Sequence, residues 1–216
     1  MQMTLNRREE YFNTLTHGLM AVLIAVTMPF VLSGAWRANP SPSSATSLGT
    51  IVFCLCMILM FGTSAIYHVL PADSHSKQLF NRFDHIAIYF AIAGSYTPIA
   101  LAIIGGSAGL SLMIIEWSLV AAGILFKILA FKRNRLTEVI STAVYLLMGW
   151  AIVPWMPEFL ARADPGCVTL IIAGGLFYTA GVVFFALKRR YAHTVWHIFV
   201  NAGAISHFLA IVLFAG

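Results

Sequence analysis

The chain has 216 residues, of which 60% are hydrophobic and 10% are charged, and its mean hydropathy is +0.86. A soluble domain carries about 25% charged residues, so this composition excludes a water-soluble globular protein and predicts a chain embedded in lipid. The net charge is +5, but the basic residues fall in short loops between apolar segments. This placement indicates membrane orientation, so we expect membrane lipids rather than nucleic acid as partners.

Seven apolar segments have about the 20 residues that a helix needs to cross a bilayer. They cover residues 14–34, 47–70, 82–104, 110–131, 137–156, 167–187 and 193–215. Turn-forming residues separate them at 39–42, 71–74, 105–106, 134, 157 and 164–166. The sequence therefore predicts an all-α integral membrane protein whose single seven-helix domain spans residues 1–216, with a short cytoplasmic segment at 1–13.

The distribution of basic residues predicts the orientation of this bundle. If successive loops alternate between the two sides, one side holds 11 of the 13 Lys and Arg residues, and the other holds only Arg37 and Arg162. The positive-inside rule makes the richer side cytoplasmic. We therefore expect the N-terminus inside and the C-terminus outside.

The same topology brings four ionisable residues to one membrane depth. His68 lies at the inner end of the second segment, Asp84 at the inner start of the third, and His193 and His197 at the inner start of the seventh. Ionisable groups inside apolar spans are costly and usually mark a functional site. These residues are far apart in the sequence, so their common depth favours a shared site.

A metal site is the chemistry that this set of residues favours. His193 and His197 are four residues apart, so they share one helix face and can bind one ion. The alternative is a pair of interfacial histidines that bond to loop carbonyls, but His68 at the same depth favours the metal. Three histidines and a water form a zinc site with an open position, although imidazole also suits copper, iron and nickel.

Two further residues are candidate catalytic groups in a zinc-dependent hydrolysis of a lipid amide or ester. Asp84 is predicted to act as a general base, to hold a water or to orient a histidine, and alternatively it caps the third helix. Ser64 is one helical turn before His68 and is predicted to polarise a substrate carbonyl or to orient water. Its alternative role is a hydrogen bond to its own helix backbone.

Other ionisable residues are expected to lie outside this site. His85 is about 100° from Asp84 around a helix, and His207 is about 15 Å deeper than His197. Glu116 is placed toward the outer half of the fourth segment, where it either snorkels or bonds to a neighbouring helix. Glu10 and His17 are also on the inner side, where the alternatives are to line the entrance, to cap the bundle or to pack, and we expect them to pack.

Four groups of residues carry a family resemblance that covers nearly the whole chain. They are EYFNTLTHG (10–18), SAIYH (64–68), FDHIAIY (83–89) with GSYTP (94–98), and HTVWHIFV (193–200) with HF (207–208). In this order they resemble the hemolysin III family, the bacterial branch of the progestin and adipoQ receptor superfamily.

The resemblance implies a multi-pass protein of the bacterial cytoplasmic membrane with a zinc ion near its inner side. By similarity to the adiponectin receptors, His68, His193 and His197 would hold the zinc, Asp84 would meet it through water, and Ser64 matches the receptors' serine. Alkaline ceramidases share a similar pattern, which implies hydrolysis of a lipid amide. Two alternatives remain open: a non-catalytic sensor or regulator with structural zinc, and a cytolysin or pore-former.

Overall fold

The computed structural model describes residues 6–34, 43–129, 135–187 and 189–214. These residues form helices, and no strand occurs among them. Seven helical spans are long and apolar enough to cross a membrane, which confirms the predicted all-α membrane fold with seven transmembrane helices. The orientation of the termini in the membrane stays a prediction.

Eight α-helices, one π-helix and one 3₁₀-helix make up the described part of the chain. They are α1 (Arg7–Leu32), α2 (Ser44–Val69), α3 (His75–Pro98), η1 (Ile99–Ile104), α4 (Gly106–Leu129), α5 (Arg135–Gly149), η2 (Val153–Trp155), α6 (Met156–Arg162), α7 (Pro165–Ala186) and α8 (Ala192–Phe214). The third span continues from α3 through the π-helix η1, and the fifth span consists of α5, η2 and α6.

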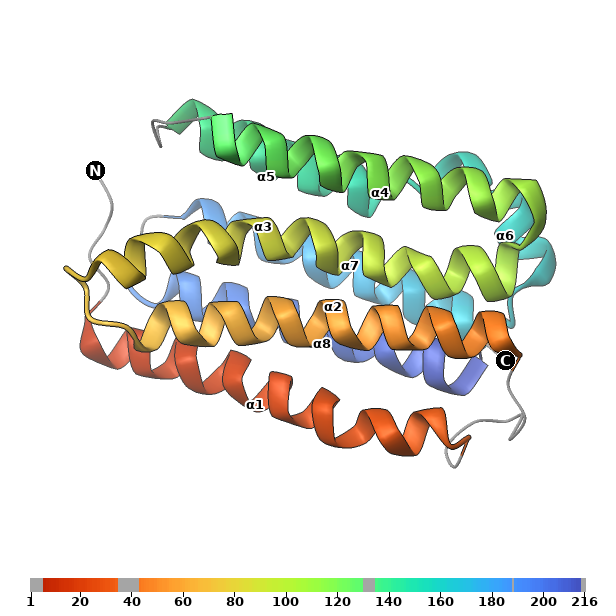
Figure 1. Ribbon diagram of the computed structural model, residues 1–216, viewed down its shortest axis with the longest axis horizontal. Coiled ribbons are helices and arrows are strands. Elements are labelled where there is room, and N and C mark those ends of the chain that lie inside the picture. The colour runs from red at the N-terminus through yellow and green to blue at the C-terminus, as the bar shows by residue number, and fades with distance from the viewer. Residues whose placement is uncertain (1–5, 35–42, 130–134, 188, 215–216) are drawn as a thin grey trace.

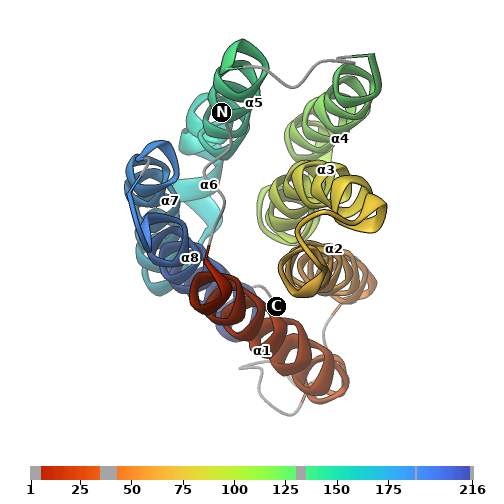
Figure 2. The ribbon, with the colours of Figure 1, turned by 90° about the vertical axis from the view of Figure 1, so that its left-hand side faces the viewer.

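Spans that follow one another in the chain run antiparallel and lie around a ring. Figure 1 shows α1 beginning at one end of the bundle and α8 ending at the other. In the end-on view of Figure 2, the order around the ring is α1, α2, α3, α4, α5, α7 and α8. Because α8 packs against α1, the last span closes the ring beside the first.

Polar caps set the beginnings of several helices, and two of them start earlier than the apolar pattern predicts. The side chain of Asn6 accepts from the backbone N–H of Glu9, and the Glu9 carboxylate accepts from that of Asn6, which is a capping box. Ser74 likewise caps α3. The first turns of α1 and α3 are polar, so hydropathy alone missed about two turns of each helix.

One predicted turn is wrong, and another is confirmed. Pro157 does not end the fifth span, because it lies in the first turn of α6, where a proline costs no helical hydrogen bond. Gly105 and Gly106 do separate the third and fourth spans, with φ angles of 61° and 57°. The turns predicted at 39–42 and 134 lie outside the described residues.

An apolar core lies between α1, α2, α3 and α8. Large side chains of α2 fill its centre, and Phe53 and Phe61 are fully buried. The other buried members are Met20, Ile24, Cys54, Met57, Met60, Ala87, Ala91, Val200, Ala204 and Ile211. This core ends beside the polar site, since the ring of Phe61 lies edge-on to that of His17 at a centroid distance of 5.0 Å.

We predict that Gly109→Ala destabilises the bundle, because α4 packs directly on the backbone of η1 at this position. An added Cβ would lie 2.0 Å from the carbonyl oxygen of Ala100 and 3.0 Å from its carbonyl carbon. Overpacking of this kind costs about 1–3 kcal/mol. Thermal unfolding of the detergent-purified protein measures the loss.

Gly62→Ala is the matched control for this substitution. An added Cβ at Gly62 meets nothing within 4 Å, so the change should leave stability equal or raise it, because alanine favours the helix. Equal melting temperatures for the two alanine variants would contradict the close packing of α4 on η1.

Candidate metal centre

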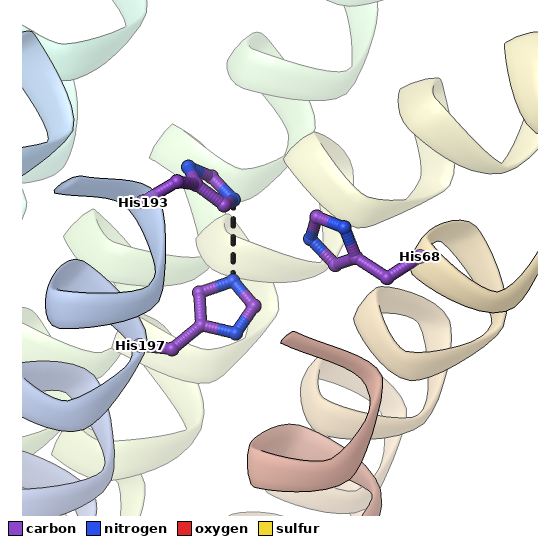
Figure 3. Close-up of side chains that lie close together, drawn as sticks. All are labelled: His68, His193 and His197. Atoms are coloured by element: carbon purple, nitrogen blue, oxygen red, sulfur yellow. Dashed lines mark hydrogen bonds between the residues drawn. The ribbon is translucent and has the colours of Figure 1, made fainter. Parts of the chain in front are cut away.

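Three histidines from two helices meet at one end of the bundle. We call it the histidine end: α1, α3 and α8 begin there, and α2 and α4 end there. Figure 3 shows His68 projecting from α2 toward His193 and His197, which project from the first turns of α8. His68 is 2% exposed and His197 is 1% exposed, while His193 is half-buried.

The ring nitrogens of the three histidines converge. The Nε2 atoms of His193 and His197 are 3.2 Å apart, and one ring nitrogen from each of the three residues lies within 4.8 Å of the other two. The ring centroid of His68 is 5.2 Å from that of His193 and 5.0 Å from that of His197. Among the described residues, this is the group of histidine, cysteine or acidic side chains that is close enough to hold one metal ion.

In His68 and in His197, a contact to Nδ1 determines that Nε2 is the nitrogen that can bind a metal ion. The Glu10 carboxylate lies 2.6 Å from Nδ1 of His68 and accepts a hydrogen bond from it. The Nε2 atom of His68 is buried and has no hydrogen-bond partner among the described residues. A carboxylate that orients a histidine in this way is the usual support of a metal ligand.

A threonine contributes the corresponding contact for His197. The hydroxyl oxygen of Thr16 lies 3.3 Å from Nδ1 of His197. The same hydroxyl group donates a hydrogen bond to the carbonyl of Phe12 at 2.9 Å. Because that hydrogen is already used, the oxygen accepts from Nδ1–H and leaves the lone pair of His197 on Nε2. Both buried histidines therefore present Nε2 to the centre of the cluster.

Polar residues along one face of α1 bring α8 into this position. The Thr194 hydroxyl donates to the Asn13 side chain at 2.7 Å. At the beginning of α8, the backbone N–H of Tyr191 donates to the Glu9 carboxylate. Tyr191 has a φ of 61°, a conformation that is uncommon outside glycine and that turns the chain into α8. The first helix thus supports the histidines of the last.

Lys77 completes the support on the α2 side. Its ammonium group pairs with Glu10 at 3.0 Å. It also donates to the carbonyls of Tyr67, His68 and Leu70 at 2.9, 3.5 and 3.1 Å. These carbonyls belong to the last turn of α2, where the helix leaves its carbonyl groups without internal partners. Lys77 therefore joins the end of α2 to α1 and neutralises the carboxylate that orients His68.

A fourth histidine lies against the cluster without joining it. The ring of His17 stacks on that of His197 at a centroid distance of 3.5 Å and an interplanar angle of 4°. His17 is 3% exposed, and neither ring nitrogen has a hydrogen-bond partner among the described residues. Its stacking fixes the plane of the His197 ring.

The donor set fits a tetrahedral zinc ion. Two imidazole nitrogens, each about 2.05 Å from a tetrahedral zinc, are separated by roughly 3.3 Å. The 3.2 Å between the Nε2 atoms of His193 and His197 matches this spacing. The buried, unpartnered Nε2 of His68 is the third donor. Without an ion, this polar atom would be unsatisfied in an apolar bundle, which is costly.

The two predicted catalytic residues lie near this end of the bundle but outside the converging group. Ser64 is 2% exposed and one helical turn before His68. Unlike Ser95, whose hydroxyl donates to the Ala91 carbonyl at 2.8 Å, Ser64 has no hydrogen-bond partner among the described residues. Its alternative role, bonding to its own helix, is therefore not seen.

Asp84 lies in the interior of α3, half-buried, with a carboxylate oxygen 3.8 Å from Nδ1 of His85. It is not the cap of α3, because Ser74 caps the helix at its earlier start. His85 also bonds to the Asn81 carbonyl at 2.8 Å, in agreement with its exclusion from the ligand set. The catalytic role of Asp84 stays a prediction.

The two ionisable residues expected in the outer half of the bundle are indeed separate from the cluster. His207 contacts the Ile171 carbonyl at 3.2 Å and packs against Tyr178. Glu116 is fully buried, and neither carboxylate oxygen has a hydrogen-bond partner among the described residues. Neither proposed role for Glu116, snorkelling or bonding to a neighbouring helix, is therefore seen.

Sequence reasoning missed the supporting roles of Glu10 and His17. Both were visible at the correct end of the first segment, and they are seven residues apart, which places them on one helix face. The capping-box pattern from Asn6 to Glu9 would have placed Glu10 inside the helix. The capping-box pattern, combined with the predicted depth of His68, was sufficient to predict that Glu10 lies beside the histidine cluster.

The fold and this cluster define a class: seven-helix membrane proteins with a histidine site inside one end of the bundle. A sequence model described as "Haemolysin-III related" matches residues 5–208. The chain is 33% identical to a "Hemolysin-3 homolog" of Bacillus subtilis (strain 168) over 208 residues, which cover 96% of this chain and 94% of that protein.

Other relatives extend this similarity. The chain is 31% identical to "Hemolysin-3" of Bacillus cereus over 214 residues, which cover 99% of this chain and 94% of that protein. It is 27% identical to "Monocyte to macrophage differentiation factor" of Homo sapiens over 213 residues, which cover 94% of this chain and 83% of that protein. The chain belongs to the hemolysin III family.

We predict that Lys77→Met loosens the end of α2, because methionine keeps an apolar stem but removes the donor to three carbonyl groups. Leaving buried acceptors unpaired costs about 1–3 kcal/mol, which accelerates local opening at least about fivefold. Hydrogen exchange of the amides in residues 66–74 measures this effect. Gln78→Met, at the exposed neighbouring position, is the control, and equal exchange in both variants would contradict the role of Lys77.

Proposed function

We propose that this protein is a zinc-dependent membrane hydrolase of lipid amides or esters. The observation that carries the proposal is the convergence of three histidine nitrogens, one of which is buried without a partner. Three histidines with an open fourth position are the ligand set of catalytic rather than structural zinc sites. The site lies within a bundle that spans the membrane, where lipids are the substrates at hand.

In this proposal, the three histidines are the metal ligands. His68, His193 and His197 would hold the ion, with Glu10 and Thr16 fixing the orientation of two of the rings. When bound, zinc supplies Lewis acidity that activates a water and polarises a carbonyl. His68 and His197 are almost fully buried, and electrostatic effects are stronger away from bulk water.

Two residues would then act on the substrate. Asp84 accepts a proton from the attacking water and returns it to the leaving group. Ser64 donates a hydrogen bond to the substrate carbonyl oxygen, and the absence of a partner among the described residues leaves its hydroxyl available. The water oxygen bonds to the carbonyl carbon, the C–N or C–O bond breaks, and the products are a fatty acid and an amine or alcohol.

The proposal includes a location in the bacterial cytoplasmic membrane with the histidine end on the cytoplasmic side. Support comes from the excess of Lys and Arg in the loops of one side and from the bacterial relatives. The described basic residues at the histidine end are Arg7, Arg8, Lys77, Arg82, Lys127, Arg135, Arg189 and Arg190, while Arg162 lies at the opposite end.

We predict about one zinc per chain in the detergent-purified protein, measured by inductively coupled plasma mass spectrometry. His68→Ala and His193→Ala/His197→Ala should lose the metal, because each removes donors that the remaining residues cannot replace. His75→Ala is the control, since His75 is exposed at the same end of the bundle and should leave the zinc content unchanged. A well-folded wild-type protein that takes up no zinc would contradict the proposal.

We also predict that the zinc-loaded protein releases fatty acid from long-chain N-acyl sphingoid lipids or from lipid esters, measured by mass spectrometry. Asp84→Asn should slow the reaction by about 100-fold or more, and Ser64→Ala by at least about 10-fold, with zinc retained. The controls are Asp73→Asn in the α2–α3 loop and Ser95→Ala, whose serine bonds to its own helix.

Equal release of fatty acid by the wild type and by His197→Ala would exclude the hydrolase. If zinc is bound but no lipid is cleaved, and if His68→Ala unfolds the bundle, the non-catalytic alternative with structural zinc holds. The pore-former stays a prediction that ion flux from proteoliposomes tests.

A further inference from the structure

A groove of about 760 Å³ lies between α2, α3 and α4, three helices that stand side by side in Figure 2. Its volume falls within the range of about 300–1,000 Å³ that is usual for small-molecule sites. Leu59 of α2, Phe83 and Phe90 of α3 and Ile124 of α4 are among its apolar walls. None of its lining residues belongs to the histidine cluster, so this groove is a separate feature.

Apolar walls alone do not distinguish this groove, because the rest of a lipid-facing surface is apolar too. What distinguishes it is a pair of cations, Arg82 of α3 and Lys127 of α4, in its lining. Since α3 begins and α4 ends at the histidine end, both cations lie toward that end of the groove. Phe90 and Ile124 lie farther along the spans.

The positive charge of Arg82 and Lys127 is not neutralised by an acidic residue in the described lining of the groove. None of the described residues that line it is acidic. Arg82 is exposed and makes no ion pair with any described residue. A guanidinium group is suited to a phosphate, which it can bind through two parallel hydrogen bonds.

We propose that this groove is a binding site for an anionic phospholipid of the surrounding bilayer. The phosphate group lies between Arg82 and Lys127, and an acyl chain runs along the apolar walls past Phe83 toward Phe90. The helical rise from Arg82 to Phe90 is about 12 Å, so the groove accommodates most of the depth of one leaflet. Basic pockets between transmembrane helices bind anionic headgroups elsewhere for the same electrostatic reason.

Native mass spectrometry of the purified protein, titrated with phosphatidylglycerol and with phosphatidylcholine, tests this site. We expect tighter binding of phosphatidylglycerol to the wild type. Arg82→Gln/Lys127→Gln should weaken that binding by roughly fivefold for each cation removed. The matched control is Arg189→Gln/Arg190→Gln, which removes the same charge at the same end but outside the groove, and it should change the affinity much less.

Equal affinity for the two lipids, or an equal loss in the control pair, would overturn the proposal in favour of general electrostatic attraction. A second measurement does not depend on the variants. A phosphatidylglycerol with a photoactivatable acyl chain should label the wild-type protein at groove residues such as Phe83, Phe90 and Ile124. Labelling confined to other helices would overturn the proposal.

Discussion

The pairing of Glu10 with His68 is the contact on which the site depends. The carboxylate lies 2.6 Å from Nδ1 of the imidazole and 3.0 Å from the ammonium group of Lys77, so it joins α1, α2 and α3 at one point. Because Nδ1 is occupied, the free lone pair of His68 is on Nε2 and faces the other two histidines. Charged groups inside a bundle are costly, and at this point Glu10 has both His68 and Lys77 as partners.

The first helix has a second role, which is to hold the last one. Contacts from Asn13 to Thr194 and from Glu9 to Tyr191 tie α1 to the beginning of α8. The ring of His17 stacks on that of His197 and defines its plane. Polar residues of α1 thus align ligands from two other helices. This arrangement explains how residues far apart in sequence form a pre-organised set of donors.

The length of the apolar segments and the turn residues between them were sufficient to predict seven spans. The alternation of loops between the two sides of the membrane was sufficient to predict that His68, His193 and His197 lie at one depth. Hydropathy does not detect the polar first turns of α1 and α3. It therefore leaves Glu10 outside the predicted first helix, and it places Asp84 at the start of the predicted third helix, where an aspartate can act as a cap. The π-helix η1 and the continuation through Pro157 depend on tertiary packing and on position within a helical turn, which composition does not report. The contacts of Lys77 follow from the path of the α2–α3 loop, which no residue pattern specified.

Competition with a chromophoric chelator measures the zinc affinity of the wild type and of Glu10→Gln, and this comparison tests whether Glu10 orients the metal centre. The glutamine keeps the size of the side chain but removes the charge that orients His68. We expect one site in both proteins, with about 10- to 100-fold weaker binding in the variant. Equal affinities, or no zinc binding by the folded wild type, would contradict a metal centre oriented by Glu10.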